Sequence, residues 1–176
     1  QPGESYAAPQ VVATWSGSGL TTASQQLHAH VRARPSHPSR PRPVLLNTWE
    51  AVYFNHDLDE LRRLADAAAE VGVERFVLDD GWFRGRDDDT SSLGDWFVDE
   101  RKYPDGLGVL VDHVTGLGME FGLWVEPEMV NPDSDLYRAH PEWALQVAGR
   151  PLLTGRHQLV LDLTRPEVSG YLFDAL

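Results

Sequence analysis

The chain has 176 residues, with 27 Asp and Glu against 15 Lys and Arg, and its formal charge at pH 7 is −12. Nucleic-acid binding needs clustered cations that neutralise phosphates, so this charge predicts no nucleic-acid partner. The absence of Cys excludes disulfides, thiolate nucleophiles and cysteine metal ligands. No apolar run approaches the ~20 residues that cross a bilayer, and the opening QPGESYAAPQ does not read as a signal peptide. We therefore expect a cytoplasmic protein with no membrane partner.

Residues 1–33 are predicted to form β-structure. The segments 10–15 and 26–34 are rich in strand-forming residues, and a Gly/Ser-rich stretch separates them. In the second segment apolar and polar residues alternate, which is the period of a strand with one buried face. His28 and His30 would then share a face, and we interpret them as solvent-facing because no third metal ligand is near in the sequence.

Residues 34–43, RPSHPSRPRP, are predicted to be a linker. They contain four prolines in ten positions. Proline fixes φ and lacks an N–H donor, so such a segment is neither a helix interior nor a central strand. A domain boundary is expected here.

From residue 44 onward, segments typical of strands and helices alternate. Predicted strands and helices follow in chain order: a strand at 44–48, a helix beginning near Asn55 or Asp57, strands at 75–78 and 119–125 flanking a helix at 105–117, a short segment at 135–140, a strand at 158–163 and a helix starting at Pro166. Alternating βα units predict an α/β fold with a parallel sheet covered by helices, either a barrel or a doubly wound sheet.

The residues that follow the strands favour the barrel. The first strand leads into NTWEAVYF rather than the Gly-rich phosphate turn of a doubly wound fold. Acids and indoles instead follow all three strands: Trp49 and Glu50, then Asp79, Asp80 and Trp82, then Trp124, Glu126 and Glu128. In a (β/α)8 barrel these strand ends form one rim around one pocket. Because sugars stack C–H faces on indoles and donate hydroxyls to carboxylates, this pattern indicates a carbohydrate site.

Asp79 and Asp80 carry the sharpest functional signal. Adjacent acids at a strand end repel unless donors separate them, which favours a functional role. Two alternatives stay open: one acid could bond nearby backbone N–H groups, or the pair could bind a metal together with Glu126. The acids at 87–89 are interpreted as a solvated loop tip without a role.

Three further residues are placed by their context. Trp96 lies in the long loop after the second strand and is predicted to be a pocket wall, because long barrel loops shape the site. Trp143 in HPEW is interpreted as a packing residue. Arg156 is either a bidentate partner for a sugar or carboxylate or a surface charge.

Several long segments occur together in one order: NTWEAVYF, FVLDDGWF, LGDWFVDERKYPDGL, LWVEPEMV, HPEW and GRHQLVLDLTRPEV. They resemble the retaining α-galactosidases of glycoside hydrolase family 36, the bacterial melibiase and raffinose-cleaving type. The resemblance implies a β-sandwich, a catalytic (β/α)8 barrel and a C-terminal β-domain, often assembled as a tetramer. The chain would then hold the end of the sandwich at 1–33, the linker at 34–43 and the N-terminal half of the barrel at 44–176.

The same resemblance assigns roles. It implies that Asp79 and Asp80 bind galactose hydroxyls, that Trp49 and Trp96 are pocket walls, and that Arg156 is a polar contact near the sugar. No metal and no cofactor are implied. A carboxylate that accepts from the axial 4-hydroxyl of galactose would be left unpaired by glucose, so selectivity is expected to lie in these acids.

The chain departs from this family's pattern where the catalytic residues are expected. The nucleophile should be the Asp of a Lys-Trp-Asp segment and the acid/base a later Asp, and neither segment is present before Leu176. The residues from 44 onward supply about half of the ~250 that a barrel needs. We therefore expect a fragment without turnover, from an enzyme that removes terminal α-linked galactose from melibiose- or raffinose-type oligosaccharides. A galactosyltransferase of the same superfamily, a sugar-binding module and a metal-dependent sugar isomerase are alternatives.

Overall fold

The computed structural model describes residues 3 and 5–176. The chain divides into two compact units, Gln1–Arg42 and Pro43–Leu176, and each is described by itself. Within the described residues, every helix falls short of the length and apolarity that crossing a bilayer requires.

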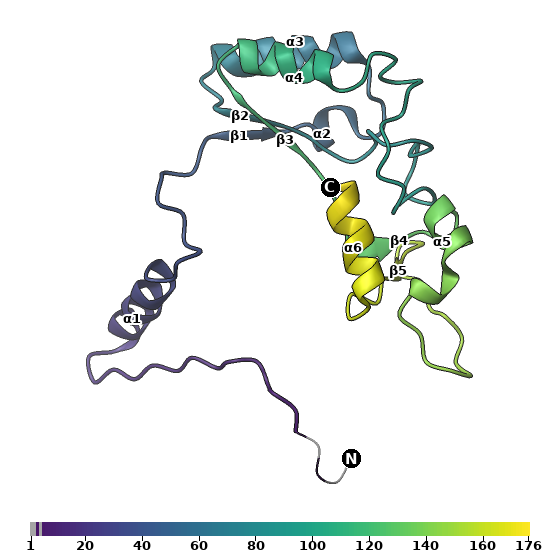
Figure 1. Cartoon of the computed structure of the whole chain (residues 1–176). Coiled ribbons are helices and arrows are strands. Elements are labelled where there is room, and N and C mark those ends of the chain that lie inside the picture. The colour runs from purple at the N-terminus through teal and green to yellow at the C-terminus, as the bar shows by residue number, and fades with distance from the viewer. Residues whose placement is uncertain (1–2, 4) are drawn as a thin grey trace. The chain divides into compact units, whose positions relative to one another are not determined.

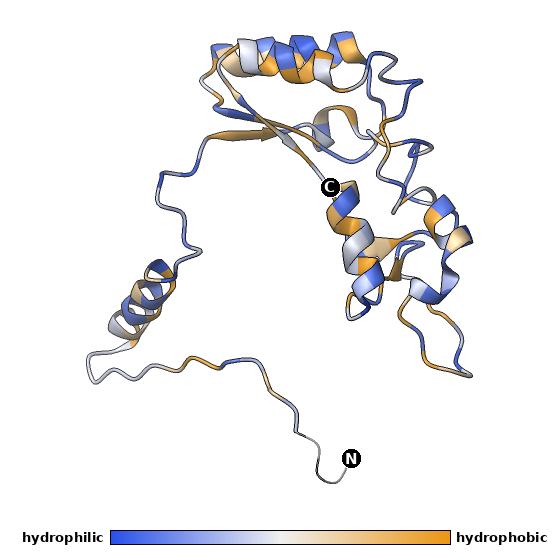
Figure 2. Cartoon of the chain, in the orientation of Figure 1, coloured by the Kyte–Doolittle hydropathy of each residue, from blue (hydrophilic) through white to orange (hydrophobic). Residues whose placement is uncertain are grey.

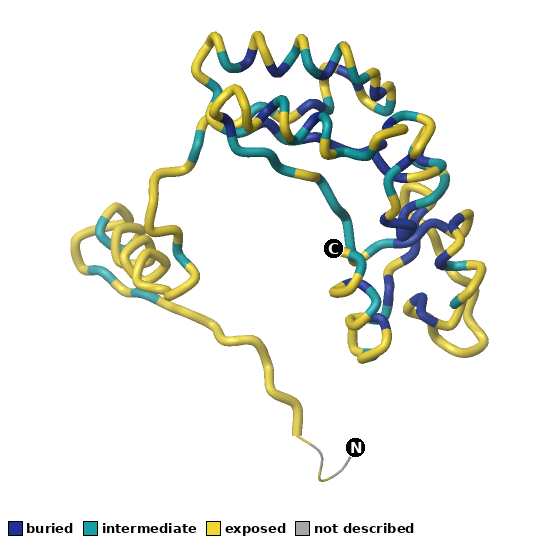
Figure 3. The backbone as a smooth tube through the Cα atoms, turned by 45° about the horizontal axis from the view of Figure 1, so that its top comes forward, coloured by how far each residue is buried: buried dark blue, intermediate teal, exposed yellow. Residues whose placement is uncertain are grey.

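The first unit contains a helix where a strand was predicted. Helix α1 spans Leu20–Arg32, and residues 10–15 form neither strand nor helix. The predicted strands of this unit are therefore wrong. Leu20, Leu27 and Val31 recur at helical spacing, whereas the two-residue alternation covers only a few positions and fits either structure. No α1 residue is buried, and Figure 3 shows the unit as mostly exposed.

The assignment of residues 1–33 to the end of a β-sandwich domain stays a prediction. Residues 1, 2 and 4 of that segment, and with them part of QPGESYAAPQ, lie outside the described residues. The division of the chain after Arg42 falls at the end of the proline-rich segment that was predicted to be a linker.

A three-stranded parallel sheet forms the centre of the second unit. Strands β1 (Leu45–Asn47), β2 (Arg75–Leu78) and β3 (Glu120–Leu123) lie in the order β1-β2-β3. Leu46 pairs with Phe76, and Phe76 with Phe121. The predicted α/β architecture with parallel strands is thus confirmed, and all three strands end at one edge.

Helices follow the strands as the βα pattern predicts. Helix α2 (Trp49–Val52) follows β1 directly, α3 (Leu58–Glu70) connects it to β2, and α4 (Gly108–Gly116) precedes β3. The Asp57 carboxylate accepts the Glu60 N–H at 2.8 Å and caps α3. Figure 1 shows α3 and α4 side by side over one face of the sheet. The helices therefore leave the strand ends free for a site.

The apolar stripe of α3 faces the sheet. Leu61, Ala65 and Ala68 recur at helical spacing and are buried. Figure 2 shows hydrophobic residues along the strands and hydrophilic ones interspersed along α3 and α4. The buried residues of α3 and of the sheet belong to one hydrophobic core. Its largest buried apolar side chains include Tyr103, Phe76, Phe83, Leu61, Leu78, Leu93 and Leu110.

The remainder of the second unit departs from simple βα alternation. Strands β4 (Met129–Val130) and β5 (Leu159–Val160) form a separate antiparallel pair, and the strand predicted at 158–163 is only two residues long. Helix α5 (Asp135–Ala139), the 3₁₀ turn η1 (Pro141–Trp143) and α6 (Pro166–Ala175) complete the unit. Trp143 is buried in the core and stacks on His140, as its interpretation as a packing residue requires.

Candidate functional site

A pocket of about 430 Å³ lies at the C-terminal ends of all three parallel strands. Its lining residues are Asn47, Trp49, Glu50, Asp79, Asp80, Trp124 and Arg156. Asn47 is the last residue of β1, Asp79 and Asp80 directly follow β2, and Trp124 directly follows β3. The structure therefore brings four of the five predicted site residues together, as the convergence of parallel strand ends predicts.

Asp79 is held by neighbouring neutral groups. Its Oδ1 accepts the backbone N–H of Asp80 at 2.7 Å, and its Oδ2 accepts from Asn47 Nδ2. The backbone N–H of Asp79 donates to the Thr48 hydroxyl at 3.0 Å. Asn47 Oδ1 also accepts the backbone N–H of Trp49 at 2.8 Å. Asn47 thus holds the Asp79 carboxylate and the backbone of Trp49, two residues of the same pocket.

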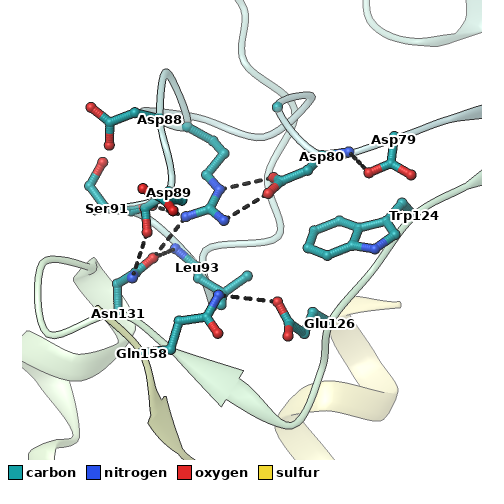
Figure 4. Close-up of polar contacts among 12 residues, drawn as sticks. Asp79, Asp80, Asp88, Asp89, Ser91, Leu93, Trp124, Glu126, Asn131 and Gln158 are labelled. Atoms are coloured by element: carbon teal, nitrogen blue, oxygen red, sulfur yellow. Dashed lines mark hydrogen bonds and ion pairs between the residues drawn. The ribbon is translucent and has the colours of Figure 1, made fainter. Parts of the chain in front are cut away.

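Asp80 is held by a cation. Arg86 Nε donates to Asp80 Oδ1 at 2.9 Å and Nη2 donates to Oδ2 at 2.7 Å. Both residues are buried, and Arg86 is 0% exposed. Its guanidinium also lies 5.6 Å from the ring centroids of Phe54 and Phe83. Figure 4 shows the two carboxylates turned toward different donors, which offset the repulsion expected of adjacent acids.

Gly81 allows the chain to turn immediately after the two acids. Its φ is +113°, and a Cβ at this position would lie 3.1 Å from His56 Nε2 and 3.2 Å from the Phe54 backbone. Only glycine fits both the positive φ and this close approach. Lys102 Nζ then donates to the carbonyls of Gly81 and Arg86, at 2.9 Å each. The loop that carries Arg86 is therefore tied to the end of β2.

Trp96 does not line the pocket in this structure. Its side chain is 5% exposed and packs in the core, with ring centroids 6.1 Å from Trp82 and 6.4 Å from Trp124. Trp124, like Trp49, lines the pocket, and the indole Nε1–H of Trp82 donates to the backbone carbonyl of Trp124 at 2.8 Å. The prediction that Trp96 is a wall is corrected accordingly: it backs the wall that Trp124 provides.

Arg156 enters the pocket from a two-residue turn. Gly155 and Gln158 exchange backbone hydrogen bonds of 3.1 and 2.9 Å, and Arg156 and His157 have φ of 51° and 61°. Gln158 Nε2 also donates to Glu126 Oε2 at 3.2 Å. Burial and the charge of Glu128 raise the pKa of Glu126, and the charge of Arg156 opposes this shift. Arg156 thus acts electrostatically on Glu126.

Sequence reasoning missed two buried residues that organise the site, Arg86 and Asn131. Arg86 stands next to the exposed acids Asp87 and Asp88, so its segment resembled a solvated loop. Asn131 joins Arg86 to residues far away in the sequence. No metal-binding group of three or more His, Asp or Glu was found among residues 3 and 5–176.

The arrangement can bind a polyhydroxylated ligand. Two indoles offer apolar faces, three carboxylates accept hydrogen bonds, and one guanidinium donates them. A parallel sheet with such a pocket at its strand ends defines an α/β protein with a site suited to sugars.

The chain belongs to the melibiase family, whose sequence model matches residues 5–176. It is 51% identical over 172 residues to the alpha-galactosidase of Escherichia coli. The aligned residues make up 97% of this chain and 24% of that protein. It therefore spans about a quarter of the length of the curated relatives that it matches.

Solved structures of the same family share the fold. The crystal structure of the GH36 alpha-galactosidase AgaB from Geobacillus stearothermophilus is 52% identical and superposes with a TM-score of 0.85, covering 89% of this chain and 22% of that one. A doubly substituted form of alpha-galactosidase AgaA from the same organism, in complex with raffinose, is 50% identical with a TM-score of 0.84, covering 89% and 22%.

Proposed function

We propose that the protein containing this chain is a retaining α-galactosidase that removes terminal α-linked D-galactose from melibiose- and raffinose-type oligosaccharides. The observation that carries the proposal is one pocket in which Trp49, Trp124, Asp79, Asp80 and Arg156 converge. Family membership and the raffinose complex of a relative support the same substrate class. The pocket is then the galactose site.

Asp80 can accept sugar hydroxyls although Arg86 occupies both of its oxygens. Each carboxylate oxygen has two acceptor positions, and Arg86 uses one on each. The remaining positions are available to a ligand in the pocket. A carboxylate that accepts from the axial 4-hydroxyl of galactose would be unpaired with glucose, and a site built on such hydrogen bonds strongly rejects the analogue that lacks them.

The reaction would be a double displacement by two carboxyl groups about 5 Å apart. One forms a glycosyl ester with inversion, the other protonates the leaving oxygen and then activates water, and the second inversion restores the configuration. We place neither group in this chain, which supplies the substrate-binding side of the N-terminal half of a (β/α)8 barrel. The wider expectations, a cytoplasmic homo-oligomer such as a tetramer that uses no cofactor, remain predictions.

Hydrolysis of a nitrophenyl α-galactoside tests this function. The full-length protein should release nitrophenol and free galactose, and the isolated 176-residue chain should release neither. A full-length protein that binds galactosides without cleaving them would be a sugar-binding module. Transfer of galactose to a second sugar in preference to water would identify a galactosyltransferase.

A further inference from the structure

Asn131, the residue that follows β4, is 0% exposed and uses its whole carboxamide. The oxygen accepts from Arg86 Nη1 at 3.0 Å and from the Leu93 N–H at 2.8 Å. The nitrogen donates to the carbonyls of His157 at 2.9 Å and Asp89 at 3.3 Å. A primary amide has two donors and can accept twice at its oxygen, so the group is satisfied. Since its partners are donors on one side and carbonyls on the other, only one orientation fits (Figure 4).

The oxygen side of Asn131 supports Asp80. The same Nη1 of Arg86 that donates to Asn131 also donates to the Ser91 carbonyl at 2.8 Å. Because Asn131 and the Ser91 carbonyl bind Nη1, the guanidinium is oriented so that Nε and Nη2 donate to the two oxygens of Asp80. A bidentate pair of this kind fixes the plane of the carboxylate as well as its position.

The nitrogen side of Asn131 supports Arg156. Two-residue hairpin turns with positive φ at both central residues favour Asn-Gly, whereas this turn consists of Arg156 and His157. Residues other than glycine adopt a positive φ at a cost in free energy, so contacts with the surrounding structure must stabilise this turn. The hydrogen bond from Asn131 to the His157 carbonyl is such a contact.

The Asn131 side chain therefore connects Arg86, which holds Asp80, to the turn that carries Arg156. Asp80 and Arg156 line the same pocket, Asp80 as a hydrogen-bond acceptor and Arg156 as a donor. We propose that Asn131 is a positioning residue that fixes Arg156 relative to Asp80 in the galactose site. The proposal rests on the function proposed above and adds a residue that does not line the pocket.

Asn131→Asp in the full-length protein removes the hydrogen bonds to the His157 and Asp89 carbonyls and keeps those from Arg86 and Leu93. In the ionised form, which the neighbouring Arg86 favours, one carboxylate oxygen can still accept from Arg86 and Leu93, while the second faces two carbonyls and can donate to neither. The matched control is Asp95→Asn, the reverse exchange at a buried position. Asp95 accepts the N–H groups of Asp135 and Leu136 at 2.8 and 2.9 Å and lies outside the pocket lining. Asp95→Asn should lower Tm and leave kcat/KM unchanged.

The decisive readout is a double-mutant cycle with Arg156→Ala. Asn131→Asp should lower kcat/KM for a nitrophenyl α-galactoside about 10–100-fold when Arg156 is present, the scale of an ångström-sized misplacement. In the Arg156→Ala background it should lower kcat/KM less than about twofold, because additivity fails for coupled residues. Equal losses in both backgrounds, or no loss in either, would overturn the proposal.

A second variant, Asn131→Ser, tests the proposal if Asn131→Asp does not fold. Asn131→Ser lacks the amide donor and introduces no charge, and the same kinetic pattern is expected. If neither variant folds, Asn131 is a general folding residue and the positioning role is overturned.

Crystal structures separate this inference from the proposed function. If the wild-type protein neither binds nor cleaves galactosides, the function fails. The structure of Asn131→Asp then still tests the coupling: the Arg156–His157 turn should shift while the Arg86–Asp80 pair stays in place. An unshifted turn would overturn the inference whatever the substrate is.

Discussion

Arg86 and Asp80 form a bidentate ion pair in which both hydrogen bonds are shorter than 3.0 Å and neither side chain reaches the surface appreciably. Removing one member of a buried pair leaves an uncompensated charge, which costs about 3–5 kcal/mol. Arg86→Met in the full-length protein should therefore lower the free energy of unfolding of the α/β unit that contains it by about that amount. Urea unfolding, followed by tryptophan fluorescence, measures the change.

Arg84→Met is the matched control for Arg86→Met. Arg84 pairs with Asp135 at 3.1 Å, but both side chains are 61% exposed. Exposed pairs contribute about 0–1 kcal/mol. Similar losses in the two variants would show that the buried pair has no special role in stability.

Asp80→Asn should weaken galactoside processing. It removes one charged hydrogen-bond acceptor from the pocket, and such a bond contributes about 1–3 kcal/mol. We expect a fall in kcat/KM of at least about fivefold, measured with a nitrophenyl α-galactoside and the full-length protein. Asp88→Asn, in the exposed loop nearby, should leave kcat/KM unchanged. Unchanged kinetics in Asp80→Asn would remove Asp80 from the site.

His56 makes stability depend on pH. Burial, and secondarily the charge of Lys102, lower the pKa of His56 to about 4. The unfolded chain, with an ordinary pKa of ~6.5, binds the proton more readily, so stability is lost as pH falls from 6.5 toward 4. The loss between pH 6.5 and 5 should be on the order of 2 kcal/mol.

His56→Gln isolates that contribution from the titration of other groups. The Tyr103 hydroxyl lies 2.8 Å from His56 Nδ1, and the Gln side chain offers a polar partner in its place. The variant should show a weaker decline in stability between pH 6.5 and 5 than the wild-type protein. His30→Gln, at an exposed position, is the control. Parallel pH profiles for wild type and His56→Gln would contradict the assignment.

His157→Gly should stabilise the turn that carries Arg156. A left-handed conformation costs a residue with a Cβ roughly 1–2 kcal/mol, and glycine avoids this while losing more entropy on folding. The net gain should be about 0.5–1 kcal/mol in thermal or urea unfolding. The His157 side chain is exposed, so His157→Ala, which keeps the Cβ, should give no gain. A lower stability of the glycine variant would show that the turn is not strained.

The sequence predicts those parts of the structure that depend on local pattern. The strand at 75–78 and the helix beginning near Asn55 or Asp57 are predicted from local signals, and each is confirmed, with Asp57 as the cap. The convergence of Trp49 and Asp79 follows from topology, because parallel strand ends share one edge. These features sufficed to predict the position of the pocket.

Other features depend on contacts between distant residues. Helix α1 lies where a strand was predicted. An alternation of apolar and polar residues over a few positions fits both the two-residue period of a strand and the 3.6-residue period of a helix, and the sequence does not show which residues are buried. Trp96 was placed at the wall because no local pattern shows which indole of a loop turns inward. Arg86 and Asn131 are separated by 45 residues, so neither segment alone reveals their hydrogen bond. Such partners are visible only in the folded chain.

Co-crystallisation of galactose with the full-length protein tests the central claim, that this pocket is the galactose site, most directly. We predict that the sugar lies between Trp49 and Trp124, with hydroxyls within hydrogen-bond distance of Asp79, Asp80 and Arg156. Galactose bound elsewhere, with this pocket filled only by water at a saturating sugar concentration, would contradict the account.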